Sequence, residues 1–117
     1  MVRTVLLTAA IAMAAAPLAA QAPDGWKVRI DRSTSAQDPD DTPELKFATM
    51  GKGFHVTGGP AGTFWNPANT GKGDFTATAT FQLMKPSGHV NYYGLIFGAA
   101  DLEGAAQNYI YFLVAQN

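Results

Sequence analysis

The sequence predicts an all-β fold, an antiparallel β-sandwich over residues 23–117 that follows an N-terminal signal peptide. Short apolar segments alternate with clusters of Gly, Pro, Asn and Asp along this part of the chain, and apolar residues nowhere recur at helical spacing over three turns. In residues 75–83 every second residue is apolar and those between are Thr or Gln, the pattern of a strand with one buried face. The length of 117 residues indicates a single domain.

Residues 1–22 have the features of a signal peptide. Arg3 supplies the positive charge of the first region, and the uncharged run 5–16 is long enough for the apolar region of a signal peptide but too short to cross a bilayer. Ala20 and Ala22 are the small residues that a signal peptidase accepts just before its cleavage site. We therefore expect cleavage after Ala22 and export to the periplasm or the outside of the cell. A buried apolar helix or a membrane anchor is the alternative.

The first four expected strands are each bounded by turn or loop residues. They are residues 26–31, 45–50, 53–57 and 62–66. The first is followed by the polar, acidic, proline-bearing segment 32–43, which is expected to be a loop. The next two are separated by Gly51 and Lys52, and the fourth lies between the turn 58–60 and the loop that begins at Asn66.

The last three expected strands carry the strongest apolar patterns. They are residues 74–84, 92–98 and 109–115. The last two are apolar almost throughout and are expected to be covered on both faces, with Asp101 and Glu103 at the tip of the loop between them. Because Asn117 follows directly on an apolar strand whose outer edge has nothing to pair with, we expect the domain to be incomplete at its C-terminus.

The composition excludes several classes of protein. The 8 Lys and Arg residues against 9 Asp and Glu give a net charge of −1, so the chain lacks the basic surface of a nucleic-acid binder. The absence of cysteine excludes disulfides, thiolate zinc sites, thiol nucleophiles and a lipoprotein anchor. After the leader, no second apolar stretch approaches the length of a membrane span.

An acidic segment is the candidate metal site. Asp38, Asp40 and Asp41, with Glu44 nearby, place four carboxylates in a short loop, and clustered oxygens are the ligands that calcium prefers. Pro43 stands where an EF-hand loop would have its glycine, so a merely solvated acidic loop is the alternative. Calcium is the one cofactor that the sequence suggests.

Aromatic side chains are the candidate ligand-binding groups. Tyr92 shares one face of its strand with two glycines, which either ease close packing or leave room for a ligand, and Tyr109 and Tyr111 lie on one face of the next strand. We expect these two faces to adjoin. A tyrosine ring can stack on a sugar while its hydroxyl bonds the sugar hydroxyls, and Trp65, beside loop residues, is a further platform. The alternative is that these aromatics fill the core.

The segment 92–98 (Tyr-Tyr-Gly-Leu-Ile-Phe-Gly), the dipeptide Asp101-Leu102 and the segment 107–114 (Gln-Asn-Tyr-Ile-Tyr-Phe-Leu-Val) resemble the middle strands of secreted concanavalin A-like jelly-roll domains of the laminin-G or glucanase type. The resemblance is greatest to uncharacterised bacterial exported proteins of that superfamily. It implies a partial jelly roll, because such domains are usually much longer than residues 23–117.

The resemblance does not extend to catalysis. Glucanases of that superfamily carry a Glu-x-Asp-x-x-Glu strand, which this chain lacks, since its only glutamates are Glu44 and Glu103. We therefore expect an exported, non-catalytic β-sandwich domain that binds a glycan or another extracellular polymer. Two alternatives stay open: a fragment of a glycan-processing enzyme whose catalytic strands lie beyond residue 117, and a structural or interaction module of the cell envelope.

Overall fold

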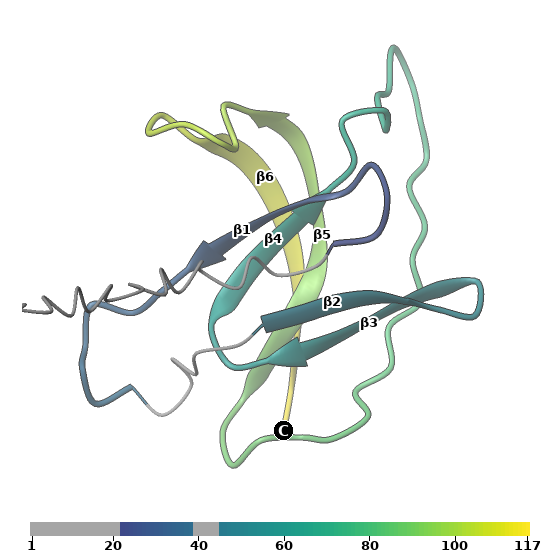
Figure 1. Cartoon of the computed structure of the whole chain (residues 1–117). Helices are drawn as coiled ribbons and strands as arrows, with labels where there is room; N and C mark the ends of the chain where they lie inside the picture. The colour runs from purple at the N-terminus through teal and green to yellow at the C-terminus, as the bar shows by residue number, and fades with distance from the viewer. Residues whose placement is uncertain (1–21, 39–44) are drawn as a thin grey trace, which may run out of the picture.

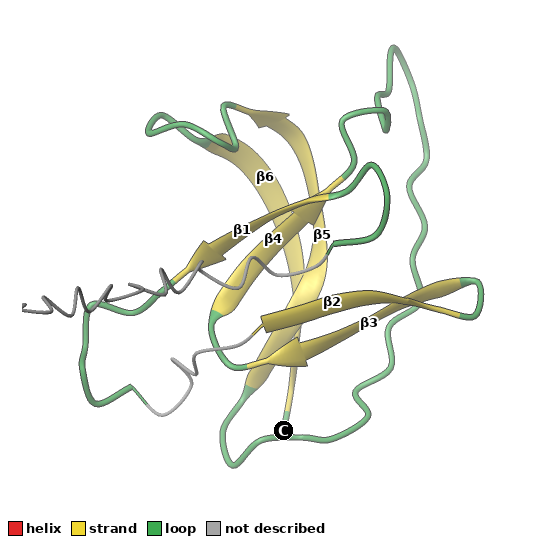
Figure 2. Ribbon diagram, in the orientation of Figure 1, coloured by secondary structure: helices red, strands yellow, loops and turns green. Residues whose placement is uncertain are grey.

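The computed structural model describes residues 22–38 and 45–117. In these residues the protein has no helix and consists of three two-stranded antiparallel sheets (Figure 2). The predicted all-β, antiparallel character is confirmed. The predicted signal peptide lies outside the described residues except for Ala22.

Six strands form the three sheets (Figure 1). They are β1 (Lys27–Asp31), β2 (Leu45–Met50), β3 (Gly53–Gly58), β4 (Ala61–Trp65), β5 (Asn91–Ala100) and β6 (Asn108–Gln116). β1 pairs with β4, β2 with β3, and β5 with β6. The first four strands begin and end within one residue of the sequence prediction, because glycine, proline and asparagine mark most of their boundaries.

The β2–β3 hairpin is closed by the turn that the sequence predicts. Met50 pairs with Gly53, so Gly51 and Lys52 form a two-residue loop. Gly51 has a φ of 58°, a left-handed conformation that glycine adopts without a steric penalty.

The core lies between the β1–β4 and β2–β3 sheets. Leu45 and Phe47 are its buried residues on β2, and the alternating pattern of that strand turns Lys46 and Ala48 to the solvent. The Phe47 ring lies at the centre of an aromatic cluster. Its centroid is 5.4 Å from Trp26, 5.1 Å from Phe54 and 4.6 Å from Phe64.

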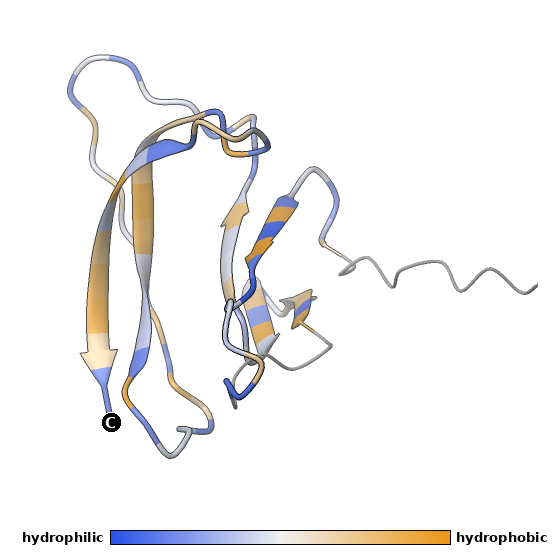
Figure 3. Ribbon diagram, turned by 90° about the vertical axis from the view of Figure 1, so that its left-hand side faces the viewer, coloured by the Kyte–Doolittle hydropathy of each residue, from blue (hydrophilic) through white to orange (hydrophobic). Residues whose placement is uncertain are grey.

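The β5–β6 hairpin stands to one side of the other two sheets (Figure 3). Its ladder is regular from Asn91, opposite Gln116, to Phe97, opposite Ile110, and is then interrupted by a bulge. Gly98 lies in this bulge with a φ of 62°. The loop that follows β5 carries Leu102, which is 8% exposed and is the buried hydrophobic residue of this part of the chain.

Two predictions about the last three strands are wrong. Residues 74–84 form no strand, and Phe75 and Phe81 are exposed. The alternating pattern favours an extended backbone, but a strand also needs hydrogen bonds to a neighbouring strand, and this segment has none among the described residues. The β5–β6 hairpin is not covered on both faces: Phe112 is 67% exposed and Ile110 59%. Within the described residues, the hairpin reaches the other sheets mainly through its loop, so its strands keep much of their apolar surface in the solvent.

Candidate functional site

An open cleft lies where the loop after β5 meets the β1–β4 sheet. Its volume is about 450 Å³. It is lined by Val28, Arg29, Ile30, Trp65, Leu102, Glu103 and Gly104. The structure thus places Trp65, a predicted ligand-binding residue, in the wall of a cleft.

Side chains alternate between the two faces of β1 and β4, so that one face of this sheet carries charged residues and the other apolar ones. Lys27 pairs with Trp65 and Arg29 with Thr63, so these four side chains share one face. Val28 pairs with Phe64 on the opposite face, which joins the aromatic core. The charged face is therefore the one on which Trp65 lies.

Two ion pairs balance the charges of the cleft. Lys27 Nζ lies 2.8 Å from each carboxylate oxygen of Glu103, and Arg29 Nε donates to Asp31 Oδ1 at 2.8 Å. The pair from Lys27 also joins β1 to a loop more than seventy residues away in the sequence. Two cations and two carboxylates leave this group of side chains with no net charge.

Arg29 holds the loop after β5 in place through two hydrogen bonds. Its Nη1 donates to the carbonyl oxygen of Leu102 at 3.3 Å and to that of Gly104 at 3.1 Å. A guanidinium suits this role because its donors are rigidly forked. The Arg29 side chain remains 31% exposed and lines the cleft.

The loop itself is held by Asp101. This residue has a φ of 52°, and its carboxylate accepts a hydrogen bond from the Ala106 N–H at 2.9 Å. The Gly104 N–H donates to the Asp101 carbonyl oxygen at 3.0 Å. A Cβ at Gly104 would overlap the Asp101 carboxylate, which would have to move away from the Ala106 N–H. The backbone that lines one side of the cleft is therefore well defined.

The predicted tyrosines lie on the β5–β6 hairpin, away from Trp65. Ile96 pairs with Tyr111 and Gly94 with Leu113, so the tyrosine-bearing and glycine-bearing faces adjoin, as predicted. Tyr92 and Tyr111 are 66% and 62% exposed and do not fill a core. We call this surface the tyrosine face; it consists of Tyr92, Gly94, Ile96, Tyr109, Tyr111 and Leu113.

The tyrosine face does not gather its rings into one site. The Tyr109 and Tyr111 rings are 6.3 Å apart, whereas Tyr92 pairs with Ala115, about 20 Å along β6 from Tyr109 at the usual rise per residue. Among the described residues, no ring contact joins Trp65 to a tyrosine. The four predicted aromatics therefore divide between the cleft and the tyrosine face.

No family model, no curated protein and no solved structure matches the chain. The resemblance to concanavalin A-like domains therefore stays a prediction from the residues quoted for it. Within residues 22–38 and 45–117, no helix has the length and hydrophobicity of a membrane span.

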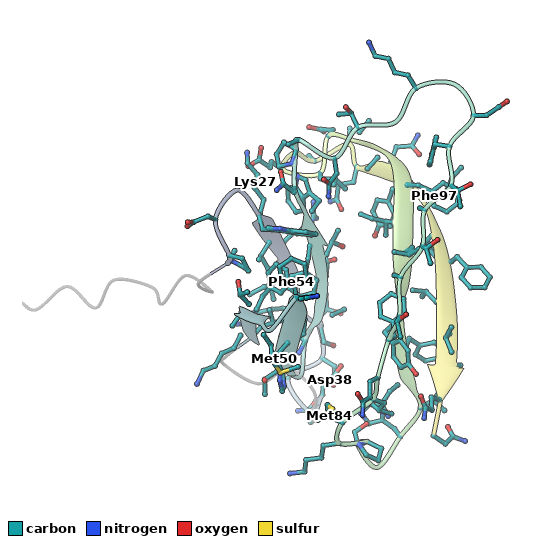
Figure 4. The ribbon with its side chains drawn as sticks, turned by 90° about the vertical axis from the view of Figure 1, so that its right-hand side faces the viewer. Lys27, Asp38, Met50, Phe54, Met84 and Phe97 are labelled. Atoms are coloured by element: carbon teal, nitrogen blue, oxygen red, sulfur yellow. The ribbon has the colours of Figure 1, made fainter. Side chains whose placement is uncertain are left out.

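The predicted calcium site falls mostly on residues that the structure does not describe. Asp40 and Asp41 lie outside the described residues, and Asp38 lies at the end of the molecule opposite to Lys27 (Figure 4). Within the described ranges, His, Asp and Glu side chains form no group of three that could hold a metal ion. Calcium at this segment stays a prediction.

Sequence reasoning missed the charged residues of the cleft. Lys27, Arg29 and Asp31 alternate along β1, and this spacing signals one charged face on the first strand. Glu103, the partner of Lys27, was predicted only as part of the tip of a loop. Nothing in the local pattern relates a loop residue to a strand so distant in sequence, so the pairing became visible only in the fold.

Proposed function

We propose that the chain is an exported, non-catalytic β-sandwich domain, a partial jelly roll of the concanavalin A-like type, that binds a glycan or another extracellular polymer in the Trp65 cleft. The observation that carries the proposal is the position of Trp65 in an open cleft beside an arginine and an ion pair. An indole ring gives a flat apolar platform for a sugar ring, and neighbouring charged groups supply hydrogen bonds to its hydroxyls.

The size and charge of the cleft favour a particular kind of ligand. A volume of about 450 Å³ lies within the usual range of ligand pockets, about 300–1,000 Å³. Because each cation of the cleft is paired with a carboxylate, the cleft offers no excess charge to an anionic or cationic polymer. An uncharged sugar unit is therefore the best match, with the partly exposed Arg29 guanidinium as a hydrogen-bond donor to it.

Tryptophan fluorescence tests the proposal because the chain has only two tryptophans, Trp26 and Trp65. Trp26 packs against Phe47 and Phe54 in the core, so Trp26→Phe leaves Trp65 as the single reporter. We expect a panel of neutral oligosaccharides to contain one that shifts or quenches the emission of this variant in a saturable way.

Trp65→Phe is the matched control, because it leaves only the core reporter. We expect its emission to be unchanged by the same oligosaccharide, and we expect Trp65→Ala to weaken binding at least tenfold when it is measured by calorimetry. A panel that leaves the Trp65 signal unchanged, or a sugar that alters only the Trp26 signal, would refute binding in the cleft.

A second candidate function, a structural or interaction module of the cell envelope, is favoured by the exposed apolar surface of β5–β6. Large hydrophobic side chains exposed together mark interaction surfaces in soluble proteins. Those exposed on β6 are Ile110, Tyr111, Phe112, Leu113 and Val114. Capture of one defined envelope partner by the wild-type chain but not by Phe112→Ser, together with no glycan affinity, would support this candidate. A glycan-processing enzyme would need residues beyond 117 and stays a prediction.

A further inference from the structure

Residues 75–83 have the conformation of a strand without the hydrogen bonds of one. The segment contains no turn and no bend, and it is drawn as a long extended trace that leads into β5 (Figure 1). It contains neither proline nor glycine, and its Thr and Phe residues favour strands. Among the described residues, β5 pairs only with β6, so its other edge is open.

One side-chain contact already connects the segment to this edge. The ring of Phe81 lies 5.5 Å from the ring of Tyr93 on β5, at an interplanar angle of 46°. Leu83, two residues further along the segment, is half-buried. This end of the segment therefore lies against β5, whereas Phe75 at its other end is 61% exposed.

We propose that residues 75–83 add to the open edge of β5 as a third antiparallel strand, with Phe81 opposite Tyr93. In this register Ala79 lies opposite Leu95 and Ala77 opposite Phe97. The connection is then residues 84–90, which contain Pro86 and Gly88 and suit a loop. The open edge of β5, a template for pairing with other chains, is thereby covered by a segment of its own chain.

The sequence pattern supports the register independently of the ring contact. Tyr93, Leu95 and Phe97 share a face of β5, and their partners on β6 are Val114, Phe112 and Ile110. The register places the apolar residues of the segment on that same face. A slip by one residue would instead place its threonines there, since successive side chains of a strand point to opposite faces. The contact and the alternation therefore select the same pairing.

The third strand also changes the tyrosine face. Thr80 would lie opposite Gly94 and Thr78 opposite Ile96, so that a row of hydroxyls would run along β5 on the side away from Tyr111. Such a row widens the surface on which a polymer could lie. This consequence for binding rests on the proposed function, whereas the strand itself does not, and the experiment below measures the strand without any glycan.

Engineered cysteines test the register cleanly because the chain contains no cysteine. The pair Ala79→Cys with Leu95→Cys places two thiols directly opposite each other, where cross-strand Cβ atoms are close enough for a disulfide. The pair Thr78→Cys with Leu95→Cys is the matched control, because the first thiol then lies on the other face. Under mild oxidation of dilute protein, we expect the 79–95 pair to form an intramolecular disulfide at least tenfold faster than the 78–95 pair.

Equal rates for the two pairs would show a flexible segment and overturn the proposal, and so would the absence of a disulfide in both. Amide hydrogen exchange on the unsubstituted protein gives a second measurement that needs no folded variant. We expect alternate amides in residues 76–82, those directed at β5, to exchange at least tenfold more slowly than their neighbours. Exchange of all of them at the rate of an unstructured peptide would also overturn the proposal.

Discussion

The substitution Phe47→Ala measures how much of the fold depends on its aromatic cluster. Phe47 is 3% exposed, and three other aromatic rings lie within 5.4 Å of its centroid. Truncation of a buried phenylalanine to alanine costs about 3–5 kcal/mol, because the transfer free energy of the ring is lost and a cavity remains. A domain the size of residues 23–117 has a total stability of roughly 5–14 kcal/mol. We therefore expect this single change to remove a large share of the free energy of unfolding.

Phe112→Ala is the matched control because the same side chain is removed from a position that is 67% exposed. Only about a third of that side chain is out of water, so we expect a cost of about 1 kcal/mol or less. Urea unfolding followed by circular dichroism gives the free energy of unfolding of both variants, and in a thermal melt Phe47→Ala should lower Tm by at least about 12 °C. If the two variants differ by less than about 1 kcal/mol, the cluster is not the stabilising core of this protein.

Two further variants test the hairpin and the loop. Gly94→Ala should destabilise the protein by about 2 kcal/mol, because its Cβ would overlap the Phe112 carbonyl oxygen, whereas Gly88→Ala, with no atom within 4 Å of its Cβ, should change Tm little in a thermal melt. Arg29→Lys should cost about 1–2 kcal/mol and speed amide exchange in the loop after β5, because an ammonium cannot reproduce the forked bonds to the carbonyls of Leu102 and Gly104. Unchanged exchange would show that this loop is held by other contacts.

The strands that the sequence predicted correctly are those whose boundaries are set by local chemistry. Gly51 follows the last residue of β2, and the Gly58–Gly59–Pro60 turn separates β3 from β4. Glycine and proline favour turns, so these boundaries follow from single residues. The segment 74–84 shows the limit of this reasoning. Its alternation is the strongest in the chain and does give an extended backbone, but hydrogen-bonded pairing depends on a partner edge that no local pattern specifies.

The sequence likewise predicted only part of the candidate site. The adjoining tyrosine and glycine faces were predictable because they follow from period-two alternation on two strands joined by one short loop. The cleft was only half predictable: Trp65 stood out by its residue type, while Arg29 and Glu103 reach it from opposite ends of the chain. Long-range contacts of this kind depend on how the sheets pack against each other. The one sign of them in the sequence is the alternation of charged residues along β1.

The location of the cleft gives it an advantage over the tyrosine face as a binding site. The cleft is lined both by β1–β4, which belongs to the aromatic core, and by the loop that ties the β5–β6 hairpin to that core. A ligand that contacts both walls binds only when the loop is docked, so its binding free energy adds to the stability of that junction. A ligand on the tyrosine face contacts the hairpin alone, since that face is formed entirely by β5 and β6. A ligand bound in the cleft, as we propose, would therefore be coupled to the contact that holds the two parts of the fold together, whereas a ligand on the exposed tyrosines would not.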